Sequence, residues 1–526
     1  MAFGKVQLNE TALLLLVGFL LVASPAIPLL LRQSGEFGMW QDVALSTWAY
    51  LAAWYGALFA GFALSPRKLA VSRDYCTLSN SRAINWSVCF LSLIAAVGAA
   101  MVMYEFAVNR GYGFSTPIAE LRVIEVMRAQ SESGSWLGGV GRLLASALAV
   151  AWILTCLRWR DVSRSTIVLL LLATAVAFFQ QLTFEGGRFF FTALSFAAIF
   201  ASVAYAVADV FQGGRVNFFS LRLIHLQPIL LIASMLFGMS IYNSAVFTSR
   251  GEATKDVIRH VIRADGEAVA VSSAGEKPEP AKRNYPGQSA GEKTGRNVTP
   301  RPTSQDRGMP ALEGRKESGA NLALRNKKIL LEYAKDDRVP LPALTYLQYA
   351  IAFHIDVSKV DGLEEFSWEK YRNAMFWIYV TQGIGEFDRI FNLENLNHSF
   401  GFYQFPQVAQ VISKFLGVDF RYDISKNLPN VGTYITLPGA YFLDFGVIFA
   451  IFLAFFTGFA FRYSLAILLE RSGSVFGLIA PFLFVILAFA PVTTLFPNFW
   501  PSFVWIALLC LPSLWKRISV RQTGSA

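Results

Sequence analysis

Cysteine and histidine are scarce in this chain, which has four of each among its 526 residues. Three of the four cysteines fall in or beside hydrophobic runs, so the sequence predicts no extracellular disulfide framework. The histidines are too far apart in the sequence for a recognisable metal site, lying at His225, His260, His354 and His398. Neither a disulfide scaffold nor a metal is therefore expected.

The local signatures of many soluble enzymes are also missing. The chain contains no glycine-rich phosphate loop ending in Lys-Ser or Lys-Thr, no paired His-Glu metal helix and no Gly-x-Ser-x-Gly elbow. We therefore expect no cofactor.

Charge is the third shortage. Charged residues make up only 16% of the chain, whereas hydrophobic residues make up 54% and the mean hydropathy is +0.44. These values are typical of integral membrane proteins, for which the bilayer is the main solvent. The formal net charge of +10 comes mostly from basic residues beside the hydrophobic runs, so it does not indicate a nucleic-acid partner.

Ten hydrophobic runs have about the 20-residue length that crosses roughly 30 Å of hydrocarbon. They are Thr11–Leu31, Val43–Ser65, Trp86–Val108, Trp136–Leu157, Ser165–Leu182, Phe189–Val210, Ile224–Val246, Tyr441–Tyr463, Val475–Thr494 and the short, proline-flanked Trp500–Trp515. We therefore predict an all-α polytopic membrane protein with about ten transmembrane helices. No small-residue cleavage signature closely follows the first run, which is interpreted as an uncleaved first helix.

Lysine and arginine cluster in alternate short loops, and this bias predicts the orientation of the chain. Basic residues follow the second, fourth, sixth and eighth spans and form the tail, as in Arg67, Lys68, Arg73, Arg82, Arg158, Arg160, Arg164, Arg215, Arg222, Arg462, Arg471, Lys516, Arg517 and Arg521. Alternate threading of ten spans places all of them on one face. Both termini are then cytoplasmic.

One long exocytoplasmic segment, 247–433, divides the chain between the seventh and eighth spans. Residues 1–246 hold seven spans, and residues 434–526 hold three spans and a cytoplasmic tail. Within the long segment, 266–320 is rich in Pro, Gly, Ser and charged residues with almost no aromatics. Such a composition buries too little apolar surface to offset chain entropy, so this stretch is predicted to be a disordered insert.

The remainder of the long segment, 323–433, regains aromatics and helical spacing. Leu341–Ile355 and Trp368–Phe387 are amphipathic stretches, so a helical cap on the membrane surface is predicted. Binding residues concentrate in loops that a rigid scaffold supports, which favours a substrate-facing role. The alternative is a soluble decoration that only stabilises the bundle.

The turn Glu185-Gly186-Gly187-Arg188 interrupts two apolar segments and places an arginine between two predicted membrane helices, on the exocytoplasmic side. A charge so close to hydrocarbon is costly, so an aqueous cavity, a counter-ion or an anionic ligand normally holds it. Arginine's planar fork grips phosphate bidentately, which suits it to a pyrophosphate at the bilayer surface. Arg188 is therefore the leading candidate for binding an anionic lipid headgroup.

Other outer-face residues supply further candidates. Arg122 and Arg389 add positive charge, although the i, i+3 spacing of Arg122 with Glu125 also fits a solvated surface helix. Asp444 enters a hydrophobic run, and His398 follows an asparagine in the cap. Both suit proton transfer or sugar binding, but Asp444 could equally be a helix-start carboxylate and His398 a structural residue.

Two of these segments resemble motifs of the Wzy-type O-antigen polymerases, a family of bacterial oligosaccharide repeat-unit polymerases. The Gly186–Arg188 turn resembles the Gly-x-Arg turn of that family. Phe376–Gly383 followed by Ser399–Phe402 resembles its large-loop pattern of a Tyr-x-Thr helix and a Phe-Gly turn.

Further matches follow in the same order along the chain. Asn430–Tyr434 and Tyr441–Gly446 resemble the family's Asn-Val-x-Thr motif and its Asp-Phe-Gly helix start. Arg122, ahead of Gly138-Gly139, resembles the arginine of an earlier outer loop.

The resemblance implies a GT-C-like membrane glycosyltransferase in the bacterial inner membrane, with a large periplasmic helical loop. Donor and acceptor glycans linked to undecaprenyl pyrophosphate would meet at the periplasmic face, where one chain is transferred and a lipid pyrophosphate leaves. A polysaccharide co-polymerase that regulates chain length is the implied protein partner. The implied substrate-binding residues are Arg188, Arg122, Arg389, Tyr441 and Asn430, and Asp444 and His398 are the candidates for acceptor activation.

Three other functions stay open. An O-antigen ligase of similar architecture would move the glycan to lipid A core instead of to another repeat. A transporter or flippase for lipid-linked sugars would be expected to carry charges within several spans and broken helices at matching positions of two halves. A scaffold for envelope assembly is the non-enzymatic possibility.

Overall fold

The computed structural model describes residues 43–65, 80–109, 136–181, 188–212, 227–234, 362–393, 396, 398–405, 435–470 and 474–523, with short pieces between 333 and 347 and at 408, 409 and 412. Of the described residues, 86% are helical and none forms a strand. The all-α prediction is confirmed for this part of the chain.

Four described helices are long and apolar enough to cross a membrane, at Leu45–Leu64, Ser81–Val108, Leu137–Leu157 and Leu437–Leu469. Each overlaps a hydrophobic run predicted to be a span. Four shorter apolar helices overlap other predicted spans, at Arg164–Gln180, Phe190–Tyr205, Val475–Ala488 and Phe496–Leu511. The first predicted span and most of the seventh lie outside the described residues, so the count of ten stays a prediction.

The chain divides into two compact units, of which one is Thr254–Tyr371 and the other combines Met1–Ala253 with Arg372–Ala526. The smaller unit includes the predicted insert 266–320, which lies outside the described residues. Its described pieces bury Tyr346 and Phe366, whose ring centroids are 5.0 Å apart. The boundary falls within helix α12 (Trp368–Phe391), so most of α12 groups with the apolar helices.

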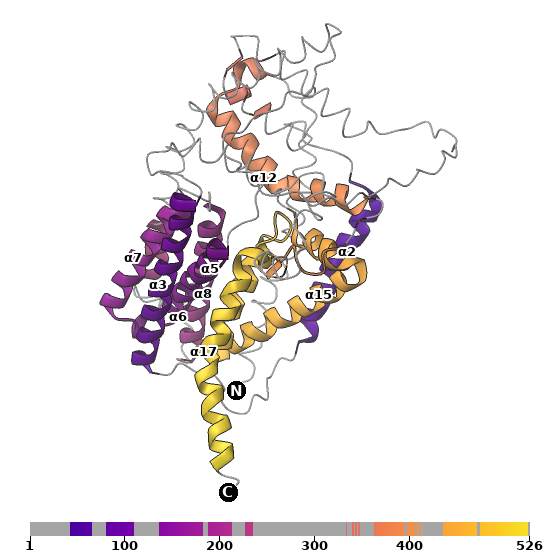
Figure 1. The fold of residues 1–526 in the computed structure, drawn as a ribbon. Coiled ribbons are helices and arrows are strands. Elements are labelled where there is room, and N and C mark those ends of the chain that lie inside the picture. The colour runs from indigo at the N-terminus through magenta and orange to yellow at the C-terminus, as the bar shows by residue number, and fades with distance from the viewer. Residues whose placement is uncertain are drawn as a thin grey trace, which may run out of the picture. The chain divides into compact units, whose positions relative to one another are not determined.

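In the larger unit, α2 (Leu45–Leu64) packs along α15 (Leu437–Glu470) through glycines on both helices (Figure 1). A Cβ atom on Gly61 would lie 1.9 Å from the carbonyl oxygen of Phe455, and one on Gly458 would lie 2.0 Å from that of Leu58. Because lipid tails are as apolar as the side chains, such packing gains mainly from close van der Waals contact, which small residues permit.

A second group of helices surrounds α6 (Ala147–Leu157), of which every residue is buried. Its neighbours are α3 (Ser81–Tyr104), α5 (Trp136–Ala145), α7 (Arg164–Gln180), α8 (Arg188–Gln212) and α17 (Phe496–Thr523). A helix that is apolar on all sides is suited to such a central position.

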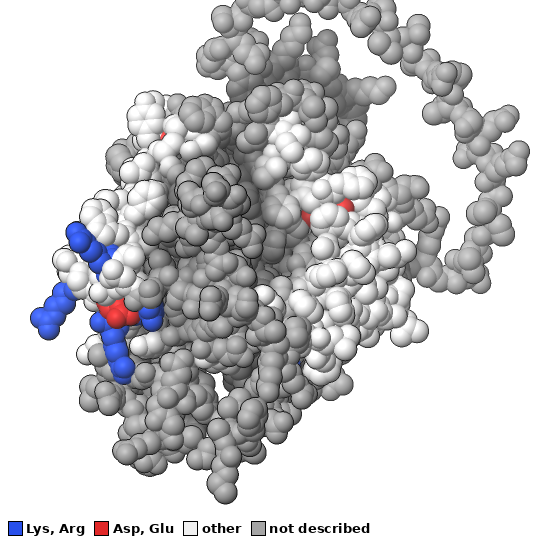
Figure 2. Space-filling model, turned by 90° about the horizontal axis from the view of Figure 1, so that it is seen from below, with Lys and Arg blue, Asp and Glu red and all other residues white. Residues whose placement is uncertain are grey.

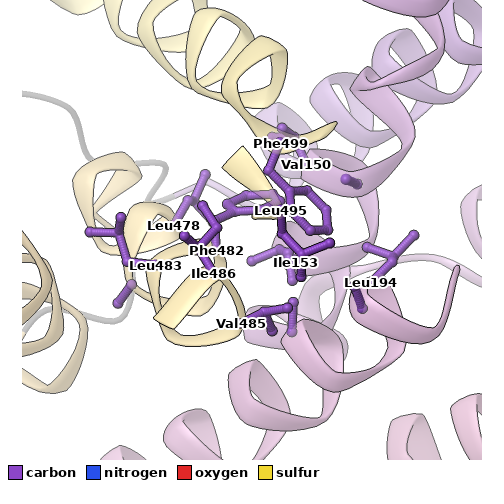
Figure 3. Close-up of a cluster of buried hydrophobic side chains, with 14 of the residues drawn as sticks. Val150, Ile153, Leu194, Leu478, Phe482, Leu483, Val485, Ile486, Leu495 and Phe499 are labelled. Atoms are coloured by element: carbon purple, nitrogen blue, oxygen red, sulfur yellow. The ribbon is translucent and has the colours of Figure 1, made fainter. Parts of the chain in front are cut away.

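The two halves of the sequence share one core. Figure 3 shows Val150 and Ile153 of α6 and Leu194 of α8 facing Phe482 of α16 (Ile479–Ala488) and Phe499 of α17. The 3-10 turn η7 (Val475–Leu478) leads into α16. The helices before and after the long loop therefore form one bundle and not two separate ones.

Basic residues gather where α3 begins, α6 ends and α7 begins. The Asn85 side chain on α3 donates a hydrogen bond to the carbonyl of Asp161 at 2.8 Å and accepts one from the N–H of Ser163 at 2.7 Å. These bonds bring Arg82 next to the connection that carries Arg158, Arg160 and Arg164. Figure 2 shows Lys and Arg side chains collected around an acidic group on the face seen from below. Basic residues that follow two different predicted spans thus share one end of the bundle.

Candidate functional site

Three helix starts and one turn meet at a single end of the larger unit. The rings of Phe190, in the first turn of α8, and Phe499, in the first turn of α17, are stacked with centroids 5.5 Å apart. Phe405 contacts the rings of Phe496 and Trp500 at 5.4 and 5.3 Å. The chain 398–405 and the starts of α8 and α17 are thus neighbours, and the following contacts add the start of α15.

Asp444 of α15 anchors the 398–405 turn. Its side chain is fully buried and accepts a hydrogen bond from the hydroxyl of Ser399. The N–H groups of Tyr403 and Gln404 donate to its two carboxylate oxygens at 2.9 and 3.0 Å. The backbone carbonyl of Asp444 also accepts a bond of 2.8 Å from the N–H of Phe400. A buried carboxylate needs such a set of donors, because it would otherwise be too costly to bury.

Two glycines allow this arrangement. Gly446 has φ 73° and ψ −178°, a conformation open essentially to glycine alone, and it kinks α15 just after Asp444. Gly401 has φ 92° and follows Phe400, which has φ 50°, so the turn reverses tightly onto the kink. The Ser-Phe-Gly and Asp-Phe-Gly segments of the sequence are therefore two sides of one contact.

His398 lies against the same kink. Its Nδ1 atom is 3.4 Å from the carbonyl oxygen of Leu443, and its Nε2 atom lies 3.0 Å from the position that a Cβ on Gly446 would occupy. The ring is partly exposed and meets the Phe442 ring edge-on at 5.6 Å. The tautomer with its proton on Nδ1 would direct that proton toward the carbonyl and leave Nε2 as an acceptor, the form a general base needs.

The end of α12 carries a cluster of charged groups. Arg389 donates to Glu386 at 2.7 Å, and the carboxylate of this pair is almost fully buried. Burial lowers the pKa of Arg389, and the carboxylates of Glu386 and Asp388 oppose that lowering. Asp388 accepts hydrogen bonds from the N–H of Ala44 and the hydroxyl of Thr47, at 3.0 and 2.6 Å. A carboxylate at the start of α2 complements the positive end of that helix, so Asp388 fixes α12 to α2.

The sequence-predicted site residues fall into four groups. Asp444 and His398 lie together where the 398–405 turn contacts the kink of α15, Arg389 lies on α12 in the same unit, and Tyr441 lies inside the bundle. Arg188 is the first residue of α8, but its side chain, like Arg122 and Asn430, lies outside the described residues.

Tyr441 is engaged inside the bundle. It is buried, its hydroxyl is 3.2 Å from that of Thr457 and its ring packs near Trp54 at 6.0 Å. These contacts hold the Tyr441 side chain inside the bundle.

Glu105 is a buried ionisable residue that the sequence interpretation overlooked. It is 2% exposed in a short π-helix, Glu105–Asn109, at the end of α3. Its carboxylate lies where a Cβ on Gly138 of α5 would be, with Oε2 only 1.8 Å from that position. Glu105 is the one charged residue in the predicted span Trp86–Val108. A single ionisable residue in a hydrophobic run is the sequence pattern that could have identified it.

Among the described residues, no group of three or more His, Cys, Asp or Glu side chains could hold a metal ion. No protein-family model, curated protein or solved structure matches the chain. The described part is an all-helical chain with helices long and apolar enough to cross a membrane.

Proposed function

We propose that this protein polymerises oligosaccharide repeat units linked to undecaprenyl pyrophosphate into O-antigen, capsule or exopolysaccharide chains. In this proposal the chain has ten spans in the bacterial inner membrane and a GT-C-like architecture. The basic end of α3, α6 and α7 faces the cytoplasm, as positively charged loops favour. The opposite end, with Asp444 and the start of α8, faces the periplasm.

One observation carries the proposal. The Ser399–Phe402 and Asp444–Gly446 segments, which resemble parts of two separate motifs of the polymerase family, form one hydrogen-bonded unit at the kink of α15. A buried carboxylate, a non-glycine residue at positive φ (Phe400, φ 50°) and a helix kink together cost free energy to assemble. Proteins concentrate such strain at functional sites, which supports a role for this unit in binding or chemistry.

The proposed roles follow the chemistry of each residue. Arg188, assisted by Arg122 and Arg389, binds the donor pyrophosphate and stabilises the negative charge that develops as it leaves. Asn430 and Tyr441 contribute to substrate binding. Asp444 positions the turn, because both of its carboxylate oxygens already accept hydrogen bonds from it.

His398 is the proposed general base. It accepts the proton of an acceptor hydroxyl while that oxygen forms a bond to the anomeric carbon of the donor sugar. The bond between that carbon and the pyrophosphate oxygen breaks, and its electron pair leaves with the lipid pyrophosphate. No nucleotide sugar takes part in this step, so it needs no nucleotide-binding motif.

Deletion of the gene in its own host tests the reaction. A polymerase deletion leaves lipopolysaccharide that carries a single repeat. A ligase deletion instead accumulates lipid-linked polymer, with no polymer attached to the lipid A core. That result would contradict polymerase activity and indicate a ligase. A co-polymerase that sets chain length is the expected partner of a polymerase.

Substitution of Arg188 tests the site. Arg188→Lys should lose most polymer while the protein level stays normal, because a lysine cannot replace the bidentate fork. Immunoblots of polysaccharide and of protein measure both quantities. Normal banding from this variant would remove Arg188 from the site, and full output from Arg188→Ala would favour a scaffold.

A further inference from the structure

Two glutamine side chains near the site have buried amide groups without partners. Both amide atoms of Gln382, on α12, and the Nε2 atom of Gln404 have no hydrogen-bond partner in the part of the chain that the structure describes. Gln404 as a whole is only 1% exposed. A buried polar atom left unsatisfied costs about 1–3 kcal/mol, so each such group in a folded protein needs an explanation.

Both glutamines adjoin the connection between α16 and α17. A Cβ on Gly383, the residue after Gln382, would lie 2.4 Å from the carbonyl oxygen of Val492. The Oε1 atom of Gln404 accepts a hydrogen bond from the hydroxyl of Thr494 at 3.3 Å. Residues 492–494 are thus in contact with α12 at Gly383, directly beside Gln382, and with the 398–405 turn through the Gln404 amide.

Aromatic side chains flank Gln404. The next residue, Phe405, forms a cluster with Phe496 and Trp500, and all three are only partly buried. The backbone N–H of Gln404 is at the same time bonded to Asp444. Gln404 thus lies between the proposed reaction site and a partly exposed aromatic surface.

The chemistry of these groups selects the ligand. An amide offers both donors and acceptors without charge, and so does a hydroxyl, whereas a pyrophosphate only accepts. Partly exposed rings beside a few convergent polar groups are typical of a small-molecule site. We infer that Gln382 and Gln404 form a subsite for the hydroxyl groups of a sugar residue in the lipid-linked glycan. This inference rests on the proposed function and adds the residues that hold the carbohydrate part.

Two probes separate the carbohydrate from the lipid pyrophosphate. One is the repeat-unit oligosaccharide released from the host polysaccharide, which has neither pyrophosphate nor polyprenol. The other is undecaprenyl pyrophosphate alone. Binding of each to the full-length protein in nanodiscs would be measured for the wild type, Gln382→Met, Gln404→Met and the exposed control Asn373→Met on the same helix.

Each glutamine variant should weaken oligosaccharide binding about tenfold or more and leave undecaprenyl pyrophosphate binding unchanged. Asn373→Met should change neither. The melting temperature of ligand-free Gln382→Met should stay the same or rise, because the substitution removes two unsatisfied buried atoms. That readout separates a ligand site from a structural one.

Three results would overturn the inference. Unchanged oligosaccharide binding in both glutamine variants would do so and, with undecaprenyl pyrophosphate still bound, would leave the proposed function standing. A clear fall in the melting temperature of Gln382→Met would show that its amide holds a structural water. Failure of the wild type to bind either probe would remove the proposed function together with the subsite.

Discussion

The contact between Asp444 and the 398–405 turn allows the effect of removing the carboxylate to be predicted quantitatively. Asp444→Ala removes the acceptor of the Ser399 hydroxyl and of the N–H groups of Tyr403 and Gln404. Each buried donor left unsatisfied costs about 1–3 kcal/mol. Because the turn can relax toward water as it detaches, we expect the free energy that docks the turn onto α15 to fall by about 3–5 kcal/mol. The rest of the bundle should keep its stability.

Hydrogen–deuterium exchange measures that loss residue by residue. A docking free energy lowered by about 3 kcal/mol should speed exchange at Tyr403 and Gln404 by roughly a hundredfold, while the amides of α15 beyond the kink stay protected. Ser399→Ala removes the hydroxyl donor and leaves the backbone donors of the carboxylate in place, so it should lower the docking free energy by only about 1 kcal/mol. Equal protection of the turn in wild type and Asp444→Ala would refute the assignment of Asp444 as its anchor.

Three further substitutions test the fold. Gly446→Ala should lower stability by about 1–3 kcal/mol because alanine is strained at φ 73°, and an unchanged melting temperature would contradict the kink. Gly61→Ala should cost about 1–3 kcal/mol because its Cβ meets a carbonyl oxygen of α15, whereas Gly56→Ala on the same helix has open space and should be tolerated. Arg389→Met should destabilise more than the double variant with Glu386→Gln, since the single change leaves a buried carboxylate without its ion pair. A double-mutant cycle with a coupling energy near zero would count against this pair.

The helices were largely predictable from the sequence, because a helix that crosses a bilayer needs about 20 mostly apolar residues in a row, which a hydropathy pattern shows. The runs Val43–Ser65 and Trp136–Leu157 agree within a few residues with Leu45–Leu64 and Leu137–Leu157. Helix starts were less predictable. α15 begins at Leu437, four residues before the predicted run, because the hydroxyl of Thr436 caps the helix by accepting a hydrogen bond from the N–H of Gly439 at 3.1 Å.

The contacts between distant segments could not be predicted. Asp444 was recognised as unusual for a hydrophobic run, but its partners lie 40 to 45 residues earlier in the sequence. Asp388 bonds Thr47 across 341 residues. Local periodicity carries no information about such pairs, which depend on how the helices on either side of the long loop assemble. No feature of the sequence distinguishes Gln382 and Gln404, because the burial of an amide without a partner depends on the packing of the folded chain.

Chain growth by the purified protein tests the central claim most directly. Full-length protein would be reconstituted in liposomes with undecaprenyl-pyrophosphate-linked repeats supplied on the side that periplasmic loops face, and the glycan lengths would be followed with time. The account predicts a ladder of longer lipid-linked chains together with released undecaprenyl pyrophosphate, and no ladder from Arg188→Lys. Glycans that keep their original length with the wild-type protein would contradict it, and their movement across the bilayer would identify a transporter.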